Sequence, residues 1–397
     1  MTEQAKVPAI RFAGFTDPWE QRKLGEFGSV AMCKRIYKEQ TSEQGDVPFF
    51  KIGTFGADPD AFISNELFED YKRTYPYPTP GTLLISAAGS IGRIVEYQGE
   101  KAYFQDSNIV WLEHDHRLND AFLKPLYSKI EWGLEGSTIK RLYNKDLLSA
   151  EVTIPDGREQ KEIGQFFAKL DSLITLHQRK YDKLVIFKKS MLEKMFPKDG
   201  ESVPEIRFAG FTDPWEQRKL EDIANRVTRK NEGESDLPLT ISSQYGLVDQ
   251  RTFFNNQVAS KDMSGYYLLR KGEFAYNKST SGDSPWGAVK RLVRYEKGCV
   301  STLYICFGLD GADPDFLVTY YETDRWYKAV QMIAAEGARN HGLLNIAPND
   351  FFDTALILPP SREEQELIGL FFARLDRLIT LHQRKRLSIR QRSPVWS

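Results

Sequence analysis

The chain has 397 residues with a formal net charge of −1, and 41% of them are hydrophobic and 27% charged. These values are typical of a globular protein of two or three domains and argue against a membrane protein. No run approaches eighteen apolar residues and MTEQAKVPAI at the start is no signal peptide pattern, so we expect a cytoplasmic protein. Three cysteines without a CxxC pair are expected to be reduced core thiols.

The first half of the chain begins with the short segment RFAGFTDPWEQRKL at residues 11–24. A variable stretch of mixed strand and helix patterns follows it. Turn glycines and apolar runs predict strands at 81–86 and 108–115, a hairpin at 92–104, helical turns at 122–129 and a last strand ending at Pro155.

A long helix is predicted next, from about residue 158 to 196, because Pro155 and Asp156 precede it and no proline interrupts it. It contains IGQFFAKLDSLITLHQRK at residues 163–180. Apolar positions that alternate steps of four and three predict a coiled-coil seam, with Lys188 as one interruption. The seam begins with Ile163, Phe167, Leu170, Ile174 and His177.

The second half repeats this order. The segment of residues 11–24 returns unchanged at 207–220, and a near-copy of the helix, IGLFFARLDRLITLHQRK, occupies residues 368–385. Between them, strands are predicted at 272–277 and 304–311, a hairpin at 287–300 and helical turns at 316–323. The second seam consists of Ile368, Phe372, Leu375, Ile379 and His382. After Lys385 the copy diverges into RLSIRQRSPVWS, which predicts a helix that ends near residue 388, about ten residues short of its twin.

The predicted fold class is α+β: two similar mixed α/β domains separated by two long helices. The helices are expected to pair as an antiparallel coiled coil with pseudo-twofold symmetry, so that His177 and His382 meet near the axis. The boundaries are 8–157 for the first repeat segment and variable domain, 158–198 for the first helix, 204–360 for the second segment and domain, 361–388 for the shortened helix and 389–397 for the divergent tail.

This order of blocks resembles the specificity subunit of type I restriction–modification systems, over about residues 8 to 385. The resemblance implies that the variable domains are target recognition domains, each reading one half of a bipartite DNA sequence. It implies that the helices form the spacer and dock two methyltransferase subunits, with restriction subunits joining the complex. The chain itself would hold no cofactor, and S-adenosylmethionine, ATP and magnesium would belong to the partners. Repeated segments would face identical partners, and variable ones would face different DNA half-sites.

Candidate DNA contacts are polar or basic residues in turns of the two variable domains, where side chains can reach phosphates or base edges. A solvated turn with an exposed arginine explains several of them equally well. In the first domain they are Lys34, Arg35, Ser86, Ser90, Arg93, Lys140, Arg141, Tyr143 and Asn144. In the second domain they are Arg229, Lys230, Asn277, Lys278, Ser279, Arg339, Asn340 and His341. Asn277, Lys278 and Ser279 follow a strand at the position where the first domain has Ser86, Ala87 and Ala88.

No catalytic or metal site is predicted, because the chain has no phosphate loop, no nucleotide cradle and no methyltransferase tetrad. His114 and His116 are interpreted as surface histidines, and Glu159-Gln160-Lys161 as an exposed first helical turn. Two alternatives stay open. One is a bifunctional restriction enzyme with a hidden nuclease or methyltransferase activity, and the other is a recombinant specificity subunit whose tail impairs assembly.

Overall fold

The structure is a computed structural model. It describes residues 8, 10–130, 132, 141–242, 245–254, 260, 262–282, 284–334 and 342–392. The chain divides into two compact units, one of residues 1–177 with 385–397 and one of residues 178–384. Each unit is described by itself.

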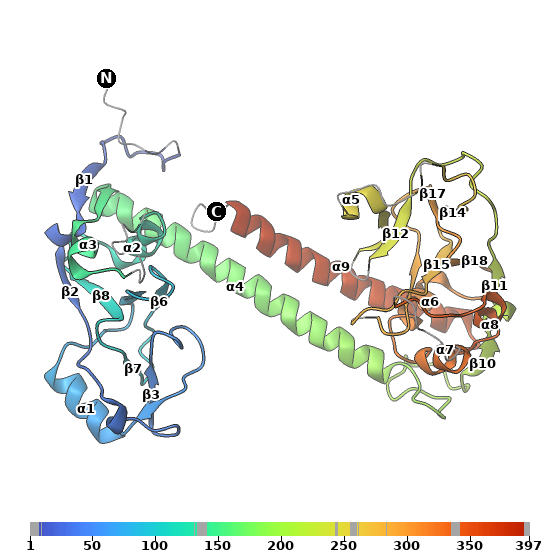
Figure 1. The fold of residues 1–397 in the computed structure, drawn as a ribbon, viewed down its shortest axis with the longest axis horizontal. Helices are drawn as coiled ribbons and strands as arrows, with labels where there is room; N and C mark the ends of the chain where they lie inside the picture. The colour runs from blue at the N-terminus through green and yellow to red at the C-terminus, as the bar shows by residue number, and fades with distance from the viewer. Residues whose placement is uncertain are drawn as a thin grey trace. The chain divides into compact units, whose positions relative to one another are not determined.

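The first unit contains the first variable domain and most of the first long helix (Figure 1). Its elements in chain order are β1 (Glu20–Lys23), a 3-10 turn (Leu24–Glu26), β2 (Gly28–Ala31), a second 3-10 turn (Lys38–Gln40), β3 (Val47–Phe50), β4 (Phe62–Ile63), α1 (Asn65–Thr74), β5 (Leu83–Ser86), β6 (Ile94–Glu96), β7 (Tyr103–Phe104), β8 (Ile109–His114), α2 (Asp120–Tyr127), α3 (Asn144–Ser149), β9 (Glu151–Ile154) and α4 (Gly157–Lys194).

The second unit contains the second variable domain, the end of α4 and most of the second long helix. Its elements are β10 (Glu216–Lys219), a 3-10 turn (Leu220–Asp222), β11 (Ala224–Arg226), β12 (Leu239–Ser242), β13 (Gly246–Asp249), α5 (Gln250–Phe254), β14 (Tyr267–Arg270), β15 (Phe274–Asn277), β16 (Ala288–Arg291), β17 (Lys297–Val300), β18 (Ile305–Leu309), α6 (Pro314–Tyr320), α7 (Tyr327–Ile333), α8 (Pro348–Phe352), β19 (Ala355–Leu358) and α9 (Arg362–Arg392).

Each variable domain contains a four-stranded antiparallel sheet, and the two sheets have equivalent strand orders. The strand order is β2-β8-β5-β6 in the first unit and β11-β18-β15-β16 in the second. The central strands β5 and β15 are apolar runs buried on both faces, which is why the sequence alone marks them. The prediction of two similar mixed α/β domains is confirmed by this shared topology.

The two domains differ in what surrounds that sheet. The first domain adds a three-stranded sheet, β4-β3-β7, and helix α1, whereas the second adds the pairs β12–β13 and β14–β17. The hairpins predicted at 92–104 and 287–300 are wrong, because β6 pairs with β5 and β7 with β3, while β16 pairs with β15 and β17 with β14. Turn glycines mark where the chain reverses, but they do not select the strand that becomes the partner.

The short repeated segment folds onto its own domain in both copies. Strand β1 pairs antiparallel with β9, with Glu20 opposite Ile154 and Lys23 opposite Glu151. Strand β10 pairs in the same register with β19, from Glu216 opposite Leu358 to Lys219 opposite Ala355. Each repeated segment therefore closes its domain at the point where the long helix begins.

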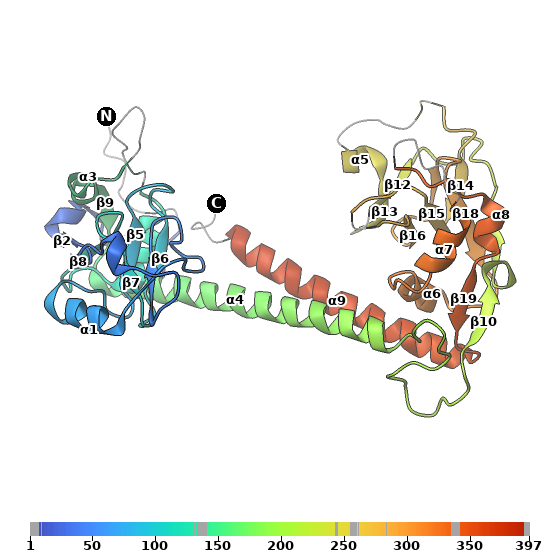
Figure 2. The same cartoon turned by 60° about the horizontal axis from the view of Figure 1, so that its bottom comes forward.

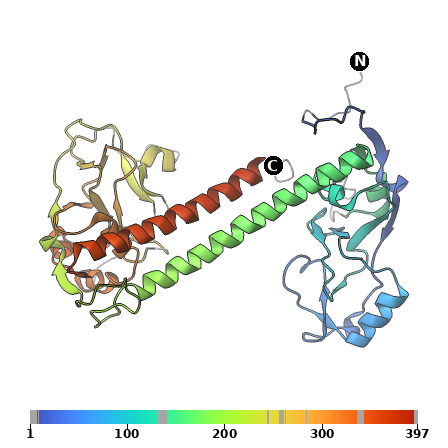
Figure 3. The ribbon, with the colours of Figure 1, turned by 180° about the vertical axis from the view of Figure 1, so that it is seen from behind.

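The end of α4 and the first half of α9 run antiparallel in the second unit (Figures 2 and 3). Phe196 lies 6.2 Å from the ring of Phe372, and the Lys188 ammonium lies 2.6 Å from a carboxylate oxygen of Asp376. Residue numbers thus rise along α9 as they fall along α4. The antiparallel pairing predicted from the seams is confirmed for this stretch.

Lys188, which the heptad pattern marks as an interruption, is held between two acidic residues. Its ammonium lies 2.7 Å from Glu322 and 2.6 Å from Asp376. Burial lowers the pKa of Lys188 and the two carboxylates raise it, with a net upward shift. Because a buried charge is tolerated only with partners, Lys188 fixes the register of α4 against α9.

Helix α9 is longer than the sequence indicated. It runs to Arg392 rather than residue 388 and has 31 residues, against 38 in α4. His177 belongs to the first unit and His382 to the second, so the meeting of their rings stays a prediction.

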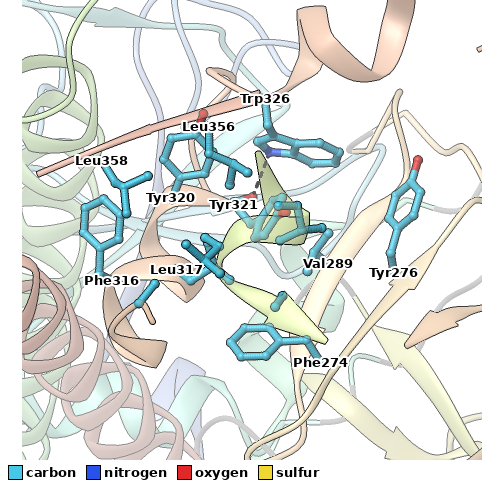
Figure 4. Packing of buried hydrophobic residues seen from close by; sticks show 14 of the residues in the cluster. Phe274, Tyr276, Val289, Phe316, Leu317, Tyr320, Tyr321, Trp326, Leu356 and Leu358 are labelled. Atoms are coloured by element: carbon cyan, nitrogen blue, oxygen red, sulfur yellow. Dashed lines mark hydrogen bonds between the residues drawn. The ribbon is translucent and has the colours of Figure 1, made fainter. Parts of the chain in front are cut away.

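The largest core of the described residues lies in the second unit (Figure 4). Tyr276 stacks on Phe351 at 4.4 Å, and Phe274 stacks on Phe307 at 5.2 Å. Seam residues Ile368, Phe372 and Leu375 are buried in this same core. The start of α9 therefore packs on its own domain before it can contribute to a coiled coil. Among the described helices, none is long and apolar enough to cross a bilayer.

Candidate nucleic-acid interface

The turn after β5 presents two of the predicted DNA contacts. Gly89 and Gly92 have φ of +65° and +79°, which lets the chain reverse within a few residues. The Ser86 hydroxyl donates to the Ser90 carbonyl and accepts from the Arg93 amide, and Ser86 is only 1% exposed. Ser86 therefore shapes the turn instead of facing solvent. Ser90 and Arg93 are exposed, and the Arg93 guanidinium also donates to the Gly56 carbonyl at 3.1 Å.

Arg141 lies beside that turn although it is far along the chain. It forms a β-bridge with Ala88, and the Leu142 amide donates to the Ala87 carbonyl at 2.9 Å. One terminal nitrogen of Arg141 donates to the Ser107 carbonyl at 2.9 Å. This contact orients the side chain, whose guanidinium has further N–H donors.

The residues after Arg141 begin helix α3. Tyr143 is its N-cap and Asn144 its first residue, and both side chains are exposed. The structure thus brings Arg141, Tyr143 and Asn144 to the same end of β5 as Ser90 and Arg93. Lys140 lies outside the described residues.

The second unit builds the equivalent place after β15. Ser279 forms a β-bridge with Leu343, and the Leu344 amide donates to the Lys278 carbonyl at 2.9 Å. These bonds repeat those of Ala88 with Arg141 and of Leu142 with Ala87, so the positional match predicted from sequence is present in the fold. Arg339, Asn340 and His341 lie outside the described residues.

The side chains at this place differ from those of the first unit. Asn277 accepts from the Ser279 amide at 3.1 Å, and Lys278 donates to the Ile346 carbonyl at 3.3 Å. Partial burial lowers the pKa of Lys278. Equivalent backbone positions therefore carry Ser86, Ala87 and Ala88 in one unit and Asn277, Lys278 and Ser279 in the other.

Four of the basic candidates, Lys34, Arg35, Arg229 and Lys230, already have partners within the protein. The Lys34 ammonium lies over the Tyr75 ring at 5.0 Å, and Arg35 pairs with Asp106 at 2.9 Å. In the second unit, Arg229 binds Glu273 at 2.7 and 2.8 Å, and Lys230 lies over Tyr267 at 4.6 Å. Lys34, Arg35 and Lys230 remain exposed and can turn to a phosphate, whereas Arg229 would first have to release Glu273.

The first turn of the long helix is predicted from sequence to be exposed, but in the structure it is buried. Glu159 and Gln160 are 0% and 2% exposed. Arg11 donates two hydrogen bonds of 2.6 Å to Glu159, and the Trp19 indole donates a third at 3.1 Å. The long-range partner outweighs the local preference of acidic residues for a solvated helix start.

The second copy forms the same ion pair. Arg207 donates to Glu364 at 2.7 and 2.8 Å, and Glu364 is fully buried. Sequence reasoning missed both pairs. A signal was available in the repeats. Each arginine lies in the short repeated segment and each glutamate lies just before the repeated helix segment, so both residues recur at matching positions in the two halves.

No metal cluster is found among the described residues. His114 contacts Asp120 at 2.9 Å through one ring nitrogen and the Asp115 carbonyl at 3.0 Å through the other.

Part of the chain is similar in sequence to known proteins. A profile of the type I restriction modification DNA specificity domain matches residues 16–185. Over 153 residues the chain is 52% identical to a Haemophilus influenzae protein described as a putative type I restriction enzyme specificity subunit. The aligned residues make up 38% of this chain and 40% of that relative. The chain thus matches less than half of the relative's length.

The fold likeness extends further than the sequence likeness. A crystal structure of the S subunit of a type I restriction–modification system from M. genitalium covers 99% of this chain and 98% of its own, with a TM-score of 0.55 and 14% identity. At that identity the likeness concerns the fold alone. The sequence likeness is therefore limited to part of the chain, whereas the likeness of fold covers nearly all of it. Residues 16–185 resemble the type I restriction modification DNA specificity domain, and this match covers less than half of the chain.

Proposed function

We propose that this chain is the DNA-reading subunit of a type I restriction–modification complex and that each unit reads one half of a bipartite target. The proposal rests on one observation: the two units have the same backbone scaffold but carry different side chains at equivalent positions. The sheets β2-β8-β5-β6 and β11-β18-β15-β16 end in equivalent turns that carry different polar residues. One scaffold with two sets of polar groups suits two different sets of base edges.

The long helices are proposed to dock two methyltransferase subunits, with restriction subunits recruited through the complex. Support comes from exposed apolar residues at matching repeat positions, Leu176 on α4 and Leu381 on α9, which are 45% and 43% exposed. Large apolar side chains exposed at repeated positions favour protein contacts. The chain is proposed to carry no catalytic group, so S-adenosylmethionine, ATP and magnesium act in the partners.

An exchange of residues 27–150 for the reader of another specificity subunit tests the two-reader proposal. The methylated sequence is expected to change in one half only, because the second unit and its turn after β15 are left intact. Single-molecule methylation mapping of genomic DNA measures the outcome. A change in both halves would reject the proposal, and S-adenosylmethionine binding by the isolated chain would reject its non-catalytic part.

Arg141→Ala is expected to weaken binding at the half-site of the first unit by about 1–3 kcal/mol, because a bidentate base contact is lost. Arg339→Ala gives the same expectation for the other half-site. Titration of the assembled complex with DNA altered in one half-site at a time measures each effect. An equal loss on every DNA sequence would assign these arginines to phosphate contacts instead.

A further inference from the structure

The connector between β7 and β8 in the first unit, residues 105–108, binds two of the predicted DNA contacts from neighbouring positions. The Asp106 carboxylate accepts a hydrogen bond from Arg35 at 2.9 Å, and the Ser107 carbonyl accepts one from Arg141 at 2.9 Å. The two arginines come from segments that are far apart in the chain. One short loop therefore determines where both guanidinium groups lie.

The backbone of this connector is strained at Ser107. Its φ is +55°, and among the described residues only Ser107 and Glu232 combine a positive φ with a side chain. The Asn108 amide donates to the Asp106 carbonyl at 2.6 Å, across Ser107. A hydrogen bond that spans three residues around a positive φ is the pattern of the γ-turn with positive φ, which is rare and strained. Because strain of this kind concentrates at functional sites, the turn is a candidate for a functional role.

The same connector also holds the backbone next to the Arg141 side chain. The Ala87 amide donates to the Asn108 carbonyl at 2.8 Å, and the Leu142 amide donates to the Ala87 carbonyl at 2.9 Å. The chain at Arg141 is thus tied through Ala87 to the loop that accepts its guanidinium. A side chain that is fixed at both ends loses less entropy when it binds a ligand.

The second unit has a connector of the same length with a different turn. Residues 301–304 lead from β17 into β18, and the Tyr304 amide donates to the Ser301 carbonyl at 3.0 Å. That bond spans four residues, as in an ordinary β-turn. Leu303, at the position of Ser107, is 56% exposed, and its φ is not positive. Of these two equivalent connectors, only that of the first unit is strained.

We propose that the turn of Asp106, Ser107 and Asn108 is a positioning element for sequence readout by the first unit. Its strained backbone aims the Ser107 carbonyl at Arg141, so that the guanidinium is already oriented when a base edge arrives, and its carboxylate holds Arg35 beside it. A relaxed backbone at Ser107 turns the carbonyl away and leaves the Arg141 side chain free to rotate. The inference rests on the proposed reading of DNA and adds the residues that make one reader selective.

Ser107→Val in the full-length chain, assembled with methyltransferase subunits, tests the turn. A β-branched residue disfavours a positive φ, so discrimination between target DNA and DNA altered in the first half-site is expected to fall about tenfold. Discrimination at the second half-site is expected to stay within about twofold, because that reader is distant and independent. Ser107→Gly removes the same hydroxyl but adopts a positive φ freely, and it is expected to lose far less discrimination. Leu303→Val, at the matching position of the second connector, is expected to change neither half-site.

A double variant decides whether the turn acts through Arg141. Arg141→Ala alone and Arg141→Ala combined with Ser107→Val are expected to discriminate equally poorly, because the turn then has no arginine to orient. Losses that multiply in the double variant, or an unchanged Ser107→Val variant, would overturn the inference and leave the two-reader proposal intact. Equal losses at both half-sites would overturn it as well, since they indicate a general loss of structure. A wild-type complex that discriminates at neither half-site would reject the proposed function and the inference with it.

Discussion

Glu364→Gln is expected to destabilise the second unit by about 3–5 kcal/mol, as the loss of one partner of a buried ion pair does. Glu364 is fully buried and accepts from Arg207 at 2.7 and 2.8 Å. The glutamine keeps the shape of the side chain but turns an N–H donor toward the guanidinium, which leaves a charge unpaired inside the protein. Urea unfolding of the full-length chain measures the loss, and hydrogen exchange in β10 and β19 locates it.

Two further variants make this result specific. Glu216→Gln removes an exposed pair with Arg218 in the same segment and is expected to cost less than about 1 kcal/mol. Glu159→Gln is the matched change in the first unit, and it is expected to speed exchange in β1 and β9 while β10 and β19 stay protected. If Glu364→Gln costs no more than Glu216→Gln, the ion pair does not hold the repeated segment in place.

The repeats and the central strands could be predicted because they are local signals. The segment at 11–24 returns letter for letter at 207–220, and strands β5 and β15 are short apolar runs next to turn glycines. Their short length and the flanking glycines favour a buried strand over a helix. The equivalence of the turn after β5 with that after β15 followed from the same reasoning.

What failed depended on contacts between distant residues. Glu159 follows the local rule for a helix start, yet Arg11 draws it into the interior. The strands of the two expected hairpins, β6 with β7 and β16 with β17, each found partners elsewhere in the domain. In the heptad pattern Lys188 is only an interruption. In the folded protein it forms ion pairs with Glu322 and Asp376, which the sequence pattern does not reveal.

The candidate site shows the same division. Arg141 is a plausible DNA contact by composition, but its place next to Ala88 is set by a β-bridge between residues far apart in the chain. Ser86 lies at the start of the predicted turn, but its hydroxyl forms hydrogen bonds within that turn. Sequence therefore indicates where a candidate DNA-contacting turn lies, and packing determines which side chains that turn exposes.

Phe196→Ala is expected to cost the second unit about 3–5 kcal/mol, the usual loss for truncating a buried phenylalanine. The ring is 1% exposed and contacts four aromatic residues contributed by the repeated segment, α6 and α9. The cavity left behind has rigid aromatic walls, which limits the collapse that would otherwise reduce the cost. Thermal or urea unfolding measures the change, and hydrogen exchange at the end of α4 is expected to rise with it.

Ile186→Ala provides the control on the same helix. Ile186 is 69% exposed, so its truncation is expected to change stability by no more than about 0.5 kcal/mol. A large gap between the two variants would establish that the end of α4 is anchored by one ring and not by the helix as a whole. Equal, small effects of the two variants would contradict the anchoring role of Phe196.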